Sequence, residues 1–74
     1  MRRYTVLVAP EAEGGYSVRV PSLPGCYTQG ETIAEALQHA QEAIELYLSV
    51  LKERGQPIPE ETEPTQAIQV SVAA

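Results

Sequence analysis

The sequence predicts an α+β fold in which one long helix covers one face of a mixed four-stranded sheet, with the element order β-β-β-α-β. Three features support this prediction. Residues 32–54 have apolar side chains at helical spacing, the segments before them have the composition or alternation of strands, and a last alternating segment follows at 67–73. The 74 residues contain no internal repeat, so a single domain over residues 1–74 is expected.

The first strand is expected at residues 3–9 (RYTVLVA), which are rich in β-branched and aromatic side chains with apolar groups on both faces. Gly14 and Gly15 can take the positive φ of the turn that follows. Residues 15–21 alternate and predict the antiparallel partner of the first strand. A turn rich in proline and glycine then leads to a short third strand at residues 26–28.

The helix has the strongest signals of any element. Thr32 and Glu35 have the spacing of a capping box at its start, and Gly55 can end it in a left-handed conformation. The apolar residues that are expected to cover the sheet fall on one face: Ile33, Ala36, Leu37, Ala40, Ile44, Tyr47, Leu48 and Leu51.

The chain after the helix first forms a linker and then a strand. Residues 56–65 contain three prolines and three glutamates and are expected to run as an extended linker over the surface. Residues 67–73 alternate again and predict the fourth strand. Because strand–helix–strand crossovers are nearly always right-handed, this strand is expected beside the first one and parallel to it, in the order 3-2-1-4.

The composition excludes several classes of function. Ten glutamates against five basic residues give a net charge of −5, which suits a basic protein partner and not a phosphate backbone, so no nucleic-acid binding is expected. The single cysteine allows no internal disulfide, and no Cys/His cluster points to a metal or cofactor. No segment approaches the roughly 18 apolar residues of a membrane span, and the N-terminal apolar run is too short for a signal peptide. A cytoplasmic protein is expected.

A second stripe on the helix is the candidate protein interface. It is spaced i, i+4, i+7 and i+11, is displaced from the buried stripe, and consists of His39, Ala43, Leu46 and Val50. In a monomer Leu46 and Val50 would lie in water. Two exposed aliphatic side chains can be incidental, but a domain of this size buries little surface, which favours homo-oligomerisation or a permanent partner.

Other chemically notable residues are expected to be structural. A nucleophilic Cys26 would need a base, and the only histidine, His39, lies well away from the buried stripe by helical position. Cys26 is therefore expected to be half-buried and inert. Tyr16 and Tyr27 are expected to fill the small core.

One stretch also resembles a known family. Residues 15–44 (GYSVRVPSLPGCYTQGETIAEALQHAQEAI) resemble the HicB family of antitoxins. The matching features are Gly15-Tyr16, Val20-Pro21, Leu23-Pro24-Gly25-Cys26, Gly30, Thr32, Glu35-Ala36 and Ala43-Ile44, with Ile58-Pro59 after the helix. The resemblance implies a truncated ribonuclease-H-like fold. It also implies a partner, a small basic HicA-like toxin that cleaves RNA and is held inactive by the antitoxin.

Many members of that family continue into a DNA-binding domain, whereas no such domain is expected in this sequence, which ends at Ala74. The fold resemblance also raises a nuclease function. Ribonuclease-H catalysis needs clustered carboxylates that hold two metal ions. There is no acidic side chain in the predicted strand segments 4–8 and 68–72. The expected function is a non-enzymatic antitoxin that binds a HicA-like toxin stoichiometrically. An orphan oligomeric scaffold and a metal-dependent ribonuclease are the alternatives.

Overall fold

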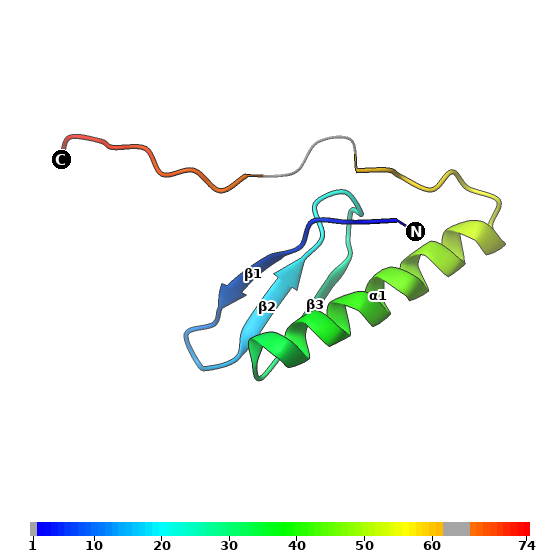
Figure 1. Cartoon of the computed structure of the whole chain (residues 1–74), viewed down its shortest axis with the longest axis horizontal. Coiled ribbons are helices and arrows are strands. Elements are labelled where there is room, and N and C mark those ends of the chain that lie inside the picture. The colour runs from blue at the N-terminus through cyan, green and yellow to red at the C-terminus, as the bar shows by residue number, and fades with distance from the viewer. Residues whose placement is uncertain (1, 62–65) are drawn as a thin grey trace.

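The computed structural model describes residues 2–61 and 66–74, in which one helix packs on one face of a three-stranded antiparallel sheet (Figure 1). The elements are β1 (Leu7–Pro10), β2 (Tyr16–Arg19), β3 (Tyr27–Gly30) and α1 (Ile33–Glu53), and the strand order is β1-β2-β3. The predicted α+β class and the order of these four elements are confirmed. β1 starts four residues later than predicted, and β3 extends two residues further.

The turn between β1 and β2 forms where the two glycines were predicted to allow it. Gly14 and Gly15 have φ values of 104° and 78°, and the register that follows pairs Val8 with Val18. β3 continues the sheet on the other side, where Val18 pairs with Thr28. Val18 therefore lies in the central strand, and its side chain is buried against the helix.

The predicted caps at Thr32 and Gly55 are confirmed, whereas the second bond of the predicted capping box is made to a different residue. The Thr32 hydroxyl accepts a hydrogen bond from the Glu35 N–H at 3.1 Å, so it satisfies one of the free donors of the first turn. The Glu35 carboxylate accepts from the N–H of Glu31 at 3.0 Å, one residue before the one that a capping box would use. At the other end Gly55 has a φ of 66°, and its N–H donates to the carbonyl of Lys52.

The predicted buried face of the helix is partly wrong. Ala36 and Ala40 are buried, but Ile33 and Leu37 are 50% and 44% exposed. The reason is the close approach of the helix to β3, since a Cβ on Gly30 would lie only 2.5 Å from the Ala36 nitrogen. The helix rests on the sheet through Ala36 and Ala40, and the larger Ile33 and Leu37 stay partly exposed.

A second cluster fixes the other end of the helix. Val20, Leu23 and Cys26 are buried there, and they pack against Ala43, Ile44, Tyr47 and Leu48 among other residues. The Tyr47 hydroxyl donates to the Pro24 carbonyl at 2.8 Å, which ties the helix to the turn before β3. Cys26 lies in the core as a structural residue, as expected, but it is buried rather than half-buried.

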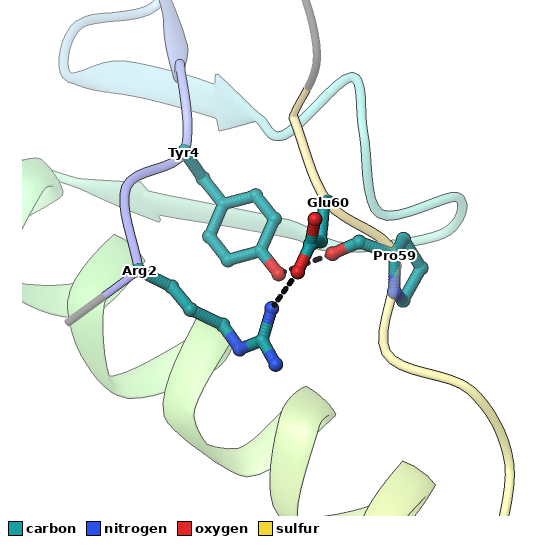
Figure 2. Close-up of polar contacts among 4 residues, drawn as sticks. All are labelled: Arg2, Tyr4, Pro59 and Glu60. Carbon is teal, nitrogen blue, oxygen red and sulfur yellow. Dashed lines mark hydrogen bonds and ion pairs between the residues drawn. The ribbon is translucent and has the colours of Figure 1, made fainter.

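The chain after the helix returns to the N-terminal segment (Figure 2). The Tyr4 hydroxyl donates to the Pro59 carbonyl, and Arg2 pairs with Glu60 at 3.1 Å. Because both members of the ion pair are solvent-exposed, it contributes little to stability. The Glu61 carboxylate accepts from the Thr5 N–H at 2.7 Å, from the Thr5 hydroxyl, and from the Ser22 hydroxyl at 3.2 Å. These contacts anchor residues 59–61 beside the start of β1.

The contacts of Glu61 predict acid-sensitive stability. Its hydrogen bonds with Thr5 hold the pKa of the carboxyl below its ordinary value of 4.5. A carboxyl whose pKa is lowered on folding stabilises the protein above the unfolded pKa, and this stabilisation is lost as the pH falls through the folded pKa. In urea unfolding, wild type should exceed Glu61→Gln in stability at neutral pH, and the difference should shrink below pH 4.5. Glu60→Gln is the control, and a pH-independent difference for Glu61→Gln would contradict the assignment.

The predicted fourth strand and the order 3-2-1-4 are not observed. Residues 66–74 are all exposed and pair with no strand of the described sheet. In Figure 1 this segment (orange to red) runs past the end of β1. Of the predicted linker, residues 56–61 form neither helix nor strand, whereas 62–65 lie outside the described residues.

Candidate protein-interaction groove

A groove of about 450 Å³ lies between the C-terminal half of α1 and the start of β3. The turn and strand side contributes Gly25, Cys26 and Tyr27. The helix and the residues after it contribute Ala43, Leu46, Tyr47, Val50, Leu51, Arg54 and Gln56. Most of these side chains are apolar, so the groove suits contact with another apolar surface and offers few groups for chemistry.

The structure brings three of the four predicted interface residues together. Ala43, Leu46 and Val50 all line the groove. Leu46 is 67% exposed, as predicted, whereas Val50 is half-buried and Ala43 packs against the second core cluster. The expectation that Leu46 and Val50 would both lie in water is therefore wrong for Val50.

His39 lies outside the groove. Its Nδ1 is 2.7 Å from the carbonyl oxygen of Gln29, so the ring is bonded to β3. The ring is half-buried there, about one turn of the helix before the groove begins. His39 therefore helps to position the helix on the sheet, and the stripe divides into one structural residue and three groove residues.

Tyr27 is the groove residue that the sequence reasoning missed. It was expected in the core, but it is 66% exposed on β3 and lines the groove opposite the helix. Alternation along the strand predicts this exposure, because Cys26 is buried toward the helix and its neighbour must point to the other face of the sheet. Tyr27 therefore borders the groove from the edge of β3 and also lines a hollow on the open face of the sheet. Tyr16, by contrast, is half-buried and packs against the core as expected.

Cys26 forms part of the floor of the groove without a reactive environment. Burial raises the pKa of its thiol, so the thiol is protonated at neutral pH. The imidazole ring of His39 makes its hydrogen bond with the Gln29 carbonyl, so it does not serve as a base for the Cys26 thiol. Within residues 2–61 and 66–74, no group of three or more histidine, cysteine or glutamate side chains could hold a metal.

Acidic side chains lie on the exposed face of the helix beside the groove. Glu42, Leu46 and Glu53 are spaced i, i+4 and i+11 and therefore share one face, and all three are exposed. Arg54 adds one positive charge to the lining. An exposed leucine with glutamates on both sides fits a partner surface that has an apolar centre and basic surroundings.

Comparison with known proteins connects this fold to one family. A family profile described as the HicB-like antitoxin of bacterial toxin–antitoxin systems matches residues 4–72. The chain belongs to the HicB-like antitoxin family. A UPF0150 protein of Synechocystis is 50% identical over 58 residues, which cover 78% of this chain and 73% of that protein. A UPF0150 protein of Thermoplasma acidophilum is 47% identical over 57 residues, or 77% and 83% of the two chains.

Two further HicB-like relatives carry more specific names. The antitoxin HicB of Escherichia coli K12 is 48% identical over 42 residues, which cover 57% of this chain but only 30% of that protein. A chain of a solved HicA3 and HicB3 toxin–antitoxin complex superposes with a TM-score of 0.66 at 27% identity, covering 85% of this chain and 70% of the other. The resemblance to HicB antitoxins in the sequence is thus confirmed. In the part of this HicB-like chain that the structure describes, no helix is long and apolar enough to cross a membrane.

Proposed function

We propose that this chain is the antitoxin of a small basic HicA-like ribonuclease and neutralises it by stoichiometric binding. The observation that carries the proposal is the likeness over 85% of the chain to a component of a HicA–HicB toxin–antitoxin complex. The family match over residues 4–72 supports it independently. The proposed role needs only the single domain and no cofactor, and its setting is the cytoplasm.

The groove gives the proposal a physical basis. Leu46 exposes apolar surface on the helix side of the groove and Tyr27 is exposed where β3 borders it, and covering such surface is the main source of binding free energy between proteins. Two residues of this kind at the centre of a contact are typical of the few side chains that dominate affinity. We therefore place the toxin contact at Ala43, Leu46 and Val50, with Tyr27 added and His39 outside it.

The charge of the chain supports the same partner. A toxin that binds RNA needs basic side chains to contact phosphates, and this chain has a net charge of −5. Opposite charges accelerate association and would direct the acidic antitoxin to the surface on which RNA binds. Inhibition would then result from covering that surface and would require no chemical step by the antitoxin.

The alternatives differ from this proposal in what they require. A metal-dependent ribonuclease would need a carboxylate cluster, and the strands β1, β2 and β3 contain no acidic residue. We therefore propose that the chain is not an enzyme. An orphan scaffold would share the fold but have no toxin to bind. An antitoxin is distinguished from it by a toxin gene beside this one and by binding of that toxin to this chain.

The proposal is tested by the reading frame next to this gene. We expect a small basic HicA-like protein there whose expression alone arrests growth and whose co-expression with this chain does not. Co-expression of Gln38→Glu, which adds an acidic side chain at an exposed position outside the groove, should protect equally well. Growth arrest that persists despite abundant folded antitoxin would contradict neutralisation.

A further inference from the structure

The last nine residues form an apolar strand-like segment without a neighbour. Residues 66–74, called the tail below, are all exposed, and the alternate side chains Ile68, Val70 and Val72 are 74%, 80% and 80% exposed. Alternation places these three side chains on one face and Gln69 and Ser71 on the other. One apolar and one polar face are typical of a strand in a sheet that has one face on a core and the other in water.

The sheet has a free edge that can accept such a strand. In an antiparallel sheet, successive residues bond to opposite neighbours. The Val20 N–H donates to the Cys26 carbonyl on the β3 side, so Val18, two residues earlier, also bonds toward β3. Its partner in β1, Val8, then directs its N–H and C=O away from β2. The free edge of β1 thus offers backbone groups for another strand.

The helix leaves apolar surface beside the same edge. Ile33 and Leu37 share a helical stripe with Ile44 and Leu48, and the last two line a hollow together with Tyr4, which precedes β1. Ile33 and Leu37 therefore lie on the β1 side of the helix, where they are half-exposed. A strand added to β1 with its apolar face toward the helix would cover both side chains.

The tail does not occupy the β1 edge of its own chain. Glu61 is fixed at Thr5, at the start of that edge. Residues 66–74 are all exposed and belong to no strand of the described sheet, and in Figure 1 this segment (orange to red) runs away from the sheet.

We propose that two copies of this chain exchange their tails, each tail forming the fourth strand beside β1 of the other copy. Ile68, Val70 and Val72 of one copy then cover Ile33 and Leu37 of its partner. The exchange supplies the missing fourth strand in the predicted place, but from a second chain. It is independent of toxin binding, because the β1 edge and the groove lie on opposite flanks of α1.

Sedimentation of the purified chain alone tests the exchange. Wild type should have twice the 8.0 kDa mass of a single chain. Removal of residues 66–74, or Val70→Glu on the apolar face, should give a monomer with unchanged helical circular dichroism. Gln69→Glu places the same charge on the opposite face of the tail and should leave the dimer intact. Leu37→Glu blocks the receiving surface and should also give a monomer.

A mixture of two of these variants distinguishes tail exchange from other modes of dimerisation. The chain without its tail retains a free β1 edge, and the Leu37→Glu chain retains a normal tail. Each is expected to be monomeric alone, and an equimolar mixture at high concentration should form a heterodimer through one donated strand. A monomeric wild type, a dimer that survives tail removal, or a mixture that stays monomeric would each overturn the proposal. Amide protection of Val8 in a monomer would overturn it as well, by showing pairing within one chain.

Discussion

Leu46→Glu is expected to weaken binding of the HicA-like toxin by about 100-fold or more while the chain stays folded. Leu46 is 67% exposed, so a carboxylate there meets water in the free protein and changes stability by only about 0.5 kcal/mol. In a dry interface the same carboxylate loses its hydration at a cost of several kcal/mol, and each 1.4 kcal/mol is about tenfold in affinity. Calorimetric titration of the toxin measures the effect.

The matched control for this variant is Gln38→Glu. It makes the same change in net charge on the same helix, but its position is exposed and outside the groove. Toxin affinity should therefore change little. If Leu46→Glu binds as tightly as Gln38→Glu, the groove between α1 and β3 is not the contact surface.

Leu23→Ala is expected to destabilise the domain by about 2–5 kcal/mol, a large part of the stability of so small a domain. Leu23 has no exposed surface, although it lies in a turn, and it packs with Val20 and Cys26 beneath the helix. Truncation removes apolar contacts and leaves a cavity that the surrounding side chains can fill only in part. The midpoint of urea unfolding should fall strongly.

Gln29→Ala is the control for this change, because its side chain is exposed on β3 and only its backbone carbonyl contacts His39. Its stability should stay within about 0.5 kcal/mol of wild type. A loss of less than about 1 kcal/mol for Leu23→Ala would show that the turn opens in solution and that the second core cluster is not formed as described.

The sequence was most informative where the local signal and the tertiary structure agree. Thr32, Glu35 and Gly55 act within one turn of the chain, so their roles at the helix ends could be predicted without knowing what the helix contacts. The pair Gly14 and Gly15 likewise marks the first turn through its own backbone conformation. The order of β1, β2, β3 and α1 followed from such local signals.

Burial depends on neighbours that the sequence does not show. Ile33 and Leu37 have the spacing of core residues but are half-exposed, because Gly30 lets the alanines of the helix approach the sheet more closely. The same limit applies to the candidate site. Leu46 was correctly expected in water, whereas His39 forms a hydrogen bond to β3 that no helical spacing reveals.

The fourth strand shows a different limit. Alternation identifies 67–73 as a segment with one apolar face, but it contains no information on which sheet edge will pair with it. The handedness of a crossover applies only when both strands belong to one chain. A tail that pairs with no strand of the described sheet satisfies the pattern without satisfying the predicted topology.

The most direct test of the central claim is a titration of the purified HicA-like protein encoded beside this gene with the purified chain, followed by RNA cleavage and by calorimetry. An antitoxin that acts by covering the toxin should abolish cleavage at a fixed molar ratio, and the heat of binding should saturate at the same ratio. Full cleavage in the presence of excess folded chain, with no heat of binding, would contradict the proposed function.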